Sequence, residues 1–343
     1  MTKDKTDLPL VETTELKIHF PIRHGLSVKA VDGVDMKVRA GDTFGVIGES
    51  GSGKSTLGRA LVGLVRPTAG SIHHRSVDSA TVSRSARQSM RRDRQIIFQD
   101  PHAALNPRMR ILDSVSEPLI IAGETRRAAE ARAYAMLDRV GLEAHFAARY
   151  PHELSGGQKS RVNIARTLTL EPKLLVCDEI VAALDVSIQA EILNLLARLQ
   201  RDMGLTYVFI THDLGVVGHV SDRIAVMYLG VFVEVGPAQR IVSRPLHPYT
   251  EALLSAEPEP YPSDLRRGER IILKGDIPSP VNPPAGCRFH TRCRYAREIC
   301  ARERPALREQ EPGHEVACHF AGDLALAEQK HGPRTVTPQE GEA

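Results

Sequence analysis

The eight-residue run from position 48 to 55 constrains this chain more than any other feature. It reads Gly48-Glu49-Ser50-Gly51-Ser52-Gly53-Lys54-Ser55 and fits the phosphate-binding loop pattern in full. An apolar run, Thr43–Ile47, precedes it, and helical spacing follows it. Glycines let the backbone curl so that its amides point at phosphates, and a helix N-terminus adds partial positive charge. The run therefore predicts a nucleotide phosphate site between a strand and a helix.

Lys54, Ser55 and Thr56 stand where the loop enters the expected helix. We expect the Lys54 ammonium to reach the β and γ phosphates and the Ser55 hydroxyl to coordinate Mg²⁺. The alternative is a Gly/Ser loop that matches by chance, but the full pattern in a strand-to-helix context argues against it. By itself, the motif indicates a bound nucleotide and leaves the reaction open.

A second apolar run, residues 174–177, ends in the carboxylates Asp178 and Glu179. Asp178 is placed to hold the Mg²⁺ shell, and Glu179 to act as the general base that polarises the attacking water. An acidic pair at a strand end could also cap a helix, but the preceding phosphate loop favours the catalytic interpretation. Cys177, inside the apolar run, is interpreted as a small core residue.

Strand-like and helix-like patterns alternate from about residue 10 to 255. Further strand candidates cover residues 207–210 and 224–227, and residues 187–202 carry apolar side chains on one helical face. This alternation predicts an α/β fold with a mostly parallel sheet, whose ligands lie at the carboxyl ends of the strands. The Ser- and Arg-rich stretch 71–94 has little periodicity and no aromatic residues to stack on bases, so we interpret it as a solvated insert or subdomain edge.

Composition narrows the class of protein. The chain has 343 residues, of which 42% are hydrophobic and 25% charged, and its net charge is only +3. That charge is too small to indicate a nucleic-acid partner. No apolar run approaches the roughly 20 residues that span a bilayer, and the first residues lack the apolar core of a secretory signal. We therefore expect the chain to stay in the cytosol and to reach a membrane only through a partner.

The run Leu154-Ser155-Gly156-Gly157-Gln158 resembles the signature sequence of ATP-binding cassette (ABC) proteins. A Ser-Gly-Gly turn that enters a helix offers amides and a hydroxyl for phosphate contact. The resemblance implies a P-loop ATPase cassette, with a RecA-like core, an antiparallel β subdomain and an α-helical signature subdomain. It also implies that two cassettes pack head to tail, with each ATP between the phosphate loop of one subunit and the signature of the other.

The other motifs of that family follow in the expected order. By resemblance, Gln99 senses the γ-phosphate, joins the Mg²⁺ site and faces the transmembrane partner, while Asp185 crosses the dimer interface and His212 is the switch histidine. Phe20 is the candidate for stacking on adenine, and an ordinary strand residue is the equal alternative. Departures from the family pattern, none at a phosphate, metal or base ligand, are Ile180, Ala182, Lys159 and Ser160.

Several segments resemble one branch of the family, the ATP-binding subunits of dipeptide and oligopeptide importers. They are residues 29–34, 99–101 with 105–109, 184–190, and 247–250 with 252–254, and the resemblance extends from about residue 12 to 322. It implies a related second ATPase subunit, two transmembrane permease subunits and an extracytoplasmic substrate-binding protein, with this chain at the cytoplasmic face of the inner membrane. The branch also includes importers of nickel, glutathione and other small solutes, so the cargo stays open.

The composition of the sequence changes near residue 256, where a proline-rich, linker-like stretch begins. We expect an ABC nucleotide-binding domain at 10–255, a weakly cored C-terminal extension at 256–322 and a disordered tail at 323–343. Four cysteines of the extension suggest a metal site rather than disulfides, which a reducing cytosol disfavours. Iron–sulfur, zinc and four free thiols stay open on the residues alone, although the tight Cys-x-x-Cys pattern typical of zinc is missing. The family resemblance implies a four-iron four-sulfur cluster on Cys287, Cys293, Cys300 and Cys318.

Two other classes of function compete with transport. The first is a soluble cassette ATPase that acts on DNA or ribosomes, against which stand the single cassette and the near-neutral charge. The second is a redox or iron sensor that uses the cysteines and only binds nucleotide, and the intact Lys54, Asp178 and Glu179 argue against it. We therefore expect an ATP hydrolase that energises the import of di- and oligopeptides.

Overall fold

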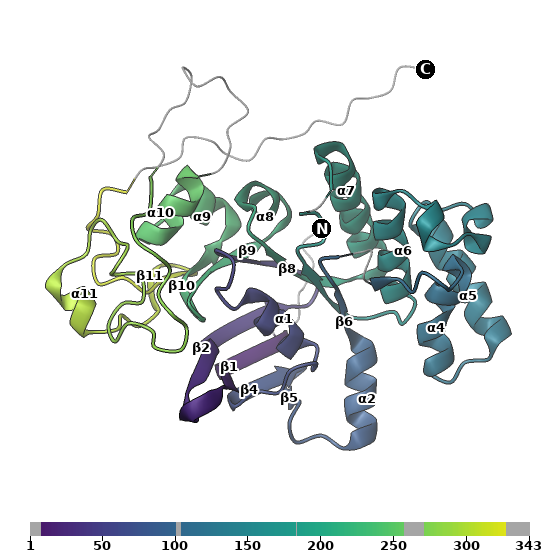
Figure 1. Cartoon of the computed structure of the whole chain (residues 1–343), viewed down its shortest axis with the longest axis horizontal. Helices are drawn as coiled ribbons and strands as arrows, with labels where there is room; N and C mark the ends of the chain where they lie inside the picture. Colours follow the sequence, from purple (N-terminus) through teal and green to yellow (C-terminus); the bar gives the residue numbers. More distant parts are fainter. Residues whose placement is uncertain (1–7, 101–103, 183, 257–270, 327–343) are drawn as a thin grey trace.

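The computed structural model describes residues 8–100, 104–182, 184–256 and 271–326. Within these residues the strands form two sheets, one of eight strands in the order β11-β12-β10-β9-β3-β8-β7-β6 and one of four in the order β2-β1-β4-β5 (Figure 1). The strands are β1 Pro9–Pro21, β2 Ser27–Arg39, β3 Thr43–Ile47, β4 Ala69–His74, β5 Val77–Asp78, β6 Arg94–Ile97, β7 Leu174–Asp178, β8 Thr206–Thr211, β9 Arg223–Tyr228, β10 Val231–Pro237, β11 Arg308–Glu311 and β12 His314–Val316.

The centre of the larger sheet is parallel. β9, β3, β8, β7 and β6 lie side by side in parallel pairs, and every residue of β3 and of β7 is buried. A continuous run of buried residues is what a parallel strand between two covered faces requires. The sheet confirms the predicted α/β fold and brings the carboxyl ends of β3, β7 and β8 to one edge, where ligands of such sheets bind.

Helices cover this sheet and form a separate group beside it. α7 buries Ile192, Leu195, Leu196 and Leu199 on one face, as their spacing predicted, and ends at Gly204 in the left-handed conformation that favours glycine. α4, α5 and α6 lie together at the right of Figure 1. The helices are α1 Lys54–Leu61, α2 Arg84–Asp93, α4 Ile111–Ile121, α5 Arg126–Arg139, α6 Gly156–Leu168, α7 Val186–Met203, α8 Leu214–Val220, α9 Ala238–Ser243, α10 Pro248–Ser255 and α11 Glu298–Arg302.

The smaller sheet is antiparallel and contains part of the Ser- and Arg-rich stretch. β4 pairs with β1, and β5 forms the edge beyond it. The stretch also forms the helix α2, which sequence reasoning did not predict. Met90 is the one residue of α2 that is buried, so no apolar stripe with helical spacing marks this helix. Ser83 caps its first turn by accepting a hydrogen bond from the amide of Ala86.

The cysteine segment, residues 287–318, is joined to the main core. β12 pairs antiparallel with β10, so that β11 and β12 extend the larger sheet. The buried ring of Phe289 lies against the rings of Tyr228 and Tyr249. The sequence predicted a loop-rich appendage without a large core of its own. The Phe289 ring packs against residues of the main core, so the segment shares that core instead of standing apart from it. Among the residues described, none of the helices combines the length and apolar character that crossing a bilayer requires.

Candidate nucleotide site

The phosphate loop, residues 48–55, connects the end of β3 to α1. Gly48 has a φ of +154° and Gly53 a φ of +108°. A Cβ on Gly48 would lie 2.1 Å from the carbonyl oxygen of Met227, and one on Gly53 would lie 2.0 Å from that of Ala30. Because backbone crowds the loop at both positions, only glycine fits there.

The side chain of Lys54 turns back into this loop. Its Nζ donates to the carbonyl oxygens of Gly48 at 2.6 Å and Glu49 at 2.9 Å, and lies 3.4 Å from Ser52 Oγ. Burial lowers the pKa of Lys54, and nearby carboxylates oppose that shift. The loop thus holds an ammonium in its interior, where phosphate oxygens could exchange with the carbonyl oxygens as its partners.

Ser55 and Asp178 form a pair of oxygen donors beside the loop. Ser55 Oγ donates to Asp178 Oδ1 at 2.9 Å, and Asp178, the last residue of β7, is 3% exposed. Burial raises the pKa of Asp178, and the hydrogen bond from Ser55 opposes that rise. Hydroxyl and carboxylate oxygens are ligands that Mg²⁺ prefers, so these two residues fit a magnesium site.

Glu179 lies between Gln99 and His212. Gln99 Nε2 donates to Glu179 Oε2 at 2.6 Å, and His212 Nδ1 is 3.5 Å from Glu179 Oε1. Glu179 has a φ of +51°, a left-handed conformation that strains a non-glycine residue and is concentrated at functional sites. Its amide donates to the carbonyl oxygen of Ile210 in the neighbouring β8 at 2.8 Å. Three motifs that are remote in sequence therefore meet beyond the ends of β6, β7 and β8.

The signature residues lie in another part of the molecule. Ser155 caps α6, because its Oγ accepts from the Gln158 amide at 3.3 Å while Gln158 Oε1 accepts from the Ser155 amide at 3.0 Å. Gly156 and Gly157 open the helix, and a Cβ on Gly157 would lie 2.9 Å from the Ile188 side chain. Asp185 precedes α7 and is exposed. Figure 1 shows α6 well apart from α1, so the signature and the phosphate loop of one chain are separated.

Phe20 lies near the end of β1, opposite Val28 of β2. Its side chain is 41% exposed and is thus available for stacking on a base. A short turn at residues Arg23–Gly25 joins the two strands. The adenine-stacking role of Phe20 stays a prediction.

The four cysteines of the cysteine segment share one small cavity. Besides these thiols, the aromatic rings of Phe289, Tyr295 and Phe320 line it. Burial raises the pKa of Cys287 to about 12 and that of Cys293 to about 11, so both are neutral thiols at pH 7. In the described ranges, three or more His, Cys, Asp or Glu side chains do not come close enough together to hold a single metal ion. The cysteines converge, but not as the ligands of one ion.

Two residues that sequence reasoning missed contact the phosphate loop. Tyr249 Oη accepts from the Glu49 amide at 2.8 Å. Arg292 donates to the Glu49 carboxylate through Nη1 at 2.7 Å and Nη2 at 3.1 Å. The partners are 200 and 243 positions apart, and no local pattern predicts such pairs. In the sequence, a hint of a role for Arg292 was its position directly before a cysteine, Cys293.

Comparison with known families divides the chain into two matched regions. Residues 31–182 match the family described as ABC transporter. Residues 233–300 match the family described as oligopeptide/dipeptide transporter, C-terminal region. Among solved structures, a protein of Clostridium perfringens that is part of an ABC transporter complex has a TM-score of 0.61 and 30% identity, covering 68% of this chain and 91% of its own. A dimeric ATP-binding cassette in a post-hydrolysis state, bound to ADP and phosphate, has a TM-score of 0.60 and 28% identity, covering 66% of this chain and 98% of its own.

Curated relatives match over almost the whole chain. A putative oligopeptide transport ATP-binding protein of Bacillus subtilis (strain 168) is 51% identical over 315 residues, which are 91% of this chain and 96% of the relative. An oligopeptide transport ATP-binding protein of Salmonella typhimurium is 50% identical, over 90% of this chain and 95% of the relative. The cassette fold, the two family matches and this identity agree. The chain therefore belongs to the ATP-binding cassette transporter family and, within it, to the ATP-hydrolysing subunits of oligopeptide transporters.

Proposed function

We propose that this chain hydrolyses ATP at the site around Glu179 and thereby energises the import of di- and oligopeptides across the cytoplasmic membrane. The observation that carries the proposal is the position of the Glu179 carboxylate, held by Gln99 and next to His212 at the sheet edge where the phosphate loop begins. The names of the relatives support the oligopeptide cargo. Nickel, glutathione or another small solute is the alternative cargo within the branch.

The residues of the site divide the work of hydrolysis. Lys54 and the loop amides bind the phosphates, with Ser155, Gly156, Gly157 and Gln158 of a second cassette on the other side. Ser55, Asp178 and Gln99 are the residues that would hold Mg²⁺, which would supply positive charge against the phosphate oxygens. The Glu179 carboxylate accepts a hydrogen bond from the attacking water and takes its proton as the bond from the water oxygen to the γ-phosphorus forms. The bond from that phosphorus to the β–γ bridging oxygen breaks in the same step, and ADP and phosphate are the products. His212 contacts the γ-phosphate from beside Glu179.

The separation of the signature from the phosphate loop supports a two-cassette arrangement. In one chain, the helix that Ser155 caps lies apart from α1, so a complete site needs the signature of a second cassette (Figure 1). We place Asp185 at that interface, and we take the partner to be a related, non-identical ATPase subunit. Two permease subunits and, indirectly, an extracytoplasmic substrate-binding protein complete the transporter. The chain would then lie on the cytoplasmic face of the membrane as a peripheral subunit.

The proposed domains have the boundaries expected from the sequence. It comprises the nucleotide-binding domain at 10–255, the C-terminal domain at 256–322 and the tail at 323–343. The last positions of the tail, 327–343, and the linker positions 257–270 lie outside the described residues. The match to the C-terminal region family supports a C-terminal unit, but it covers residues 233–300 and so begins before the proposed boundary at 255. Phe20 is proposed as the adenine contact of the first domain.

The cysteine segment is proposed to hold a four-iron four-sulfur cluster. All four cysteines line one cavity walled by aromatic rings, a setting that suits an all-thiolate cluster. The absence of a single-ion site among the described residues does not count against a cluster, because each of its thiolates binds a different iron. A bound cluster would require thiolates, so Cys287 and Cys293 would have to lose their protons to solvent as it binds.

The cluster proposal is tested by the colour, iron and acid-labile sulfide of the purified protein. Cys293→Ser is expected to remove all three. Cys177→Ser is the matched control, because Cys177 is fully buried in β7, away from the cavity that the other cysteines line. A colourless, iron-free wild-type protein would show that the segment holds no cluster.

The proposed function is tested by ATP turnover and by uptake. In the transporter assembled from the full-length chain and its partner subunits, Glu179→Gln is expected to lower kcat by roughly 10²- to 10⁴-fold, because it removes the general base and leaves Mg-ATP binding intact. Glu298→Gln is the control, since Glu298 is an exposed residue paired with Arg302 on α11. Wild-type turnover by Glu179→Gln would refute the assignment of the base.

Uptake by a deletion strain separates the candidate cargoes. Restoring this chain is expected to restore uptake of labelled di- and oligopeptides, and the Glu179→Gln variant is expected not to. Restored uptake of nickel or glutathione, without peptide uptake, would move the chain to another part of the branch. Recovery of the protein on nucleic acid, and not with permease subunits, would favour the non-transport class instead.

A further inference from the structure

Two residues from the C-terminal half hold the phosphate loop at Glu49. Arg292, in the cysteine segment, donates two hydrogen bonds to the Glu49 carboxylate, with Nη1–Oε2 at 2.7 Å and Nη2–Oε1 at 3.1 Å. Tyr249, on α10, accepts from the Glu49 amide at 2.8 Å. The side chain and the backbone of one loop residue are therefore both fixed from outside the loop.

These contacts are shielded from water. The side chain of Arg292 is 8% exposed and that of Glu49 26%, while Tyr249 is fully buried. A bidentate, charge-assisted pair with little solvent access is stronger and better oriented than an exposed ion pair. The Arg292–Glu49 contact thus restrains the loop.

Glu49 in turn orients the rest of the loop. Its carbonyl oxygen accepts from Lys54 Nζ at 2.9 Å and from the Ser52 amide at 3.2 Å. A rotation of the peptide group that carries the Glu49 carbonyl would displace both the Lys54 ammonium and the Ser52 amide, which face the phosphate-binding interior. Arg292 therefore bears on phosphate binding through Glu49, without reaching the substrate.

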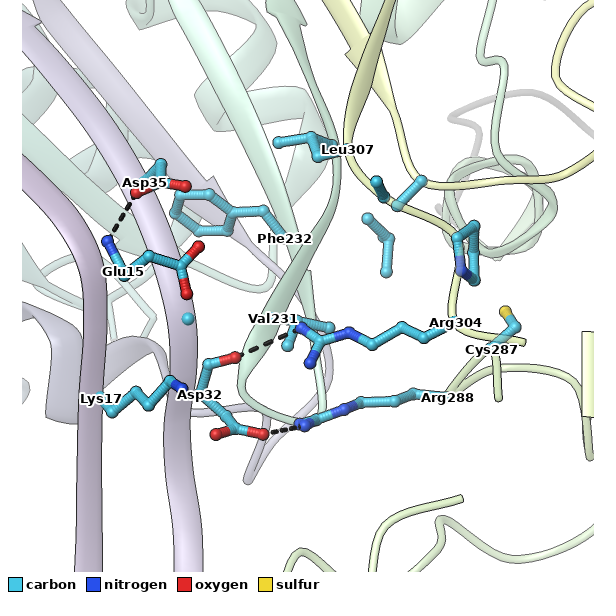
Figure 2. Close-up of a pocket in the computed structure, with 15 residues that line it drawn as sticks. Glu15, Lys17, Asp32, Asp35, Val231, Phe232, Cys287, Arg288, Arg304 and Leu307 are labelled. Atoms are coloured by element: carbon cyan, nitrogen blue, oxygen red, sulfur yellow. Dashed lines mark hydrogen bonds and ion pairs between the residues drawn. The ribbon is translucent and has the colours of Figure 1, made fainter. Parts of the chain in front are cut away.

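Arg292 is placed by the way in which the cysteine segment docks on the cassette. The Arg292 amide donates to the carbonyl oxygen of the buried Phe289 at 3.0 Å. Figure 2 shows Arg288 and Arg304 converging on Asp32 of β2, at one wall of a cavity of about 390 Å³; Arg288 pairs with the carboxylate and Arg304 donates to the carbonyl oxygen at 3.3 Å. The segment is thus anchored on the antiparallel sheet and on the phosphate loop together.

We propose that Arg292 is a positioning residue for ATP hydrolysis, which fixes the phosphate loop through Glu49 and makes the geometry of the ATP site depend on the docked cysteine segment. The inference rests on the proposed role of residues 48–55 as the site of the ATP phosphates. It extends that role to a residue of the C-terminal segment, 243 positions from its partner.

The test compares three variants of the full-length chain in the assembled transporter, with ATP turnover measured at limiting and saturating Mg-ATP. Arg292→Gln is expected to raise KM and to lower kcat/KM roughly 10- to 100-fold, because a displaced loop misplaces the phosphates. Arg292→Lys, which keeps the charge and loses the second hydrogen bond, is expected to recover part of the loss. Glu49→Gln is expected to resemble Arg292→Gln, and the double variant to be no worse than the poorer single one, because both remove the same contact.

The matched control is Arg294→Gln. Arg294 lies on the other side of Cys293 and pairs with Glu251 at 2.9 Å, with 51% of its side chain exposed. It is expected to keep wild-type KM. A purely structural role of Arg292 would lower the melting temperature and the active fraction but leave KM unchanged, and that outcome would overturn the proposal.

Two further outcomes separate this inference from the proposed function. The positioning role alone would be overturned if the double variant lost kcat/KM by the product of the two single losses. Wild-type kcat/KM in both Arg292→Gln and Glu49→Gln would overturn it as well. Wild-type turnover by Glu179→Gln, measured in parallel, would instead overturn the assigned ATP site. If Arg292→Gln does not fold, Glu49→Gln decides the question from the loop side of the contact.

Discussion

The phosphate loop and the cysteine segment are held in place by different kinds of contact. In the loop, backbone lies against backbone, so that Gly48 and Gly53 leave no room for a Cβ. In the cysteine segment, the strand β12 pairs with the backbone of β10, and the rest of the segment is anchored through side chains, chiefly Arg288, Arg292 and Phe289. The path of the loop therefore depends on two glycines that lie against neighbouring backbone, whereas the position of the segment depends also on side chains that reach distant partners, Glu49 of the loop among them.

Gly53→Ala is the substitution expected to disturb the shape of the phosphate loop most. The new Cβ would lie 2.0 Å from the Ala30 carbonyl oxygen, at a φ of +108°. The loop must shift, and strain of about 1–3 kcal/mol at such a position corresponds to a rise of roughly 5- to 150-fold in the Kd of Mg-ATP. Titration of the purified chain with a fluorescent ATP analogue measures this rise.

Gly51→Ala is the control within the same loop. Gly51 has a φ of +77°, but a Cβ there would meet no atom within 4 Å. The variant is therefore expected to show only the milder strain of a left-handed residue, about 1 kcal/mol. Equal losses of affinity in the two variants would show that crowding by backbone does not shape the loop.

The same contrast explains what the sequence could predict. The phosphate loop, the carboxylates Asp178 and Glu179, and the Ser155 cap of α6 are local patterns, because each needs only a strand end, a turn or a helix start. The parallel sheet followed from alternating strand and helix patterns. The left-handed conformation of Glu179 was not predictable, since the surrounding strands impose it on an ordinary residue.

The remaining features depend on partners far away in sequence. The contact of Arg292 with Glu49 joins residues 243 positions apart, and the packing of Phe289 against Tyr228 and Tyr249 gives no periodic signal. Helix α2 was missed for a different reason, since it buries little more than Met90 and so shows no apolar stripe. Local sequence therefore predicts the chemistry of the site better than it predicts the docking of the segment that holds it.

Removal of the proposed cluster tests how far the cysteine segment depends on its thiols. If the cysteines hold iron, stripping it with a chelator is expected to speed amide hydrogen exchange in the segment by roughly tenfold or more, because the backbone contacts there then lose their support. The Cys287 amide, bonded to the Cys300 carbonyl oxygen at 2.8 Å, is the most direct reporter. Amides of β7 and β8 serve as the internal control and are expected to keep their protection. Unchanged exchange at Cys287 would show that the fold of the segment does not depend on a cluster.

A pH dependence is expected where the two regions meet. His247 precedes α10, the helix that carries Tyr249 to the phosphate loop, and its Nδ1 accepts from the Tyr249 amide at 3.0 Å. That bond needs a neutral ring nitrogen, and burial lowers the pKa of His247 from 6.5 to about 3. The folded chain therefore keeps the ring unprotonated at pH values at which the unfolded chain binds a proton.

The sign of the effect follows from this difference. Stability from the neutral ring is fully present above about pH 6.5 and is lost as the pH falls towards about 3. The slope for one proton is about 1.4 kcal/mol of unfolding free energy per pH unit. In His247→Asn the side-chain oxygen can still cap the helix but does not titrate. Denaturant unfolding from pH 7 to 4 is therefore expected to show a shallower loss for the variant, and parallel curves would mean that His247 does not couple the α10 cap to pH.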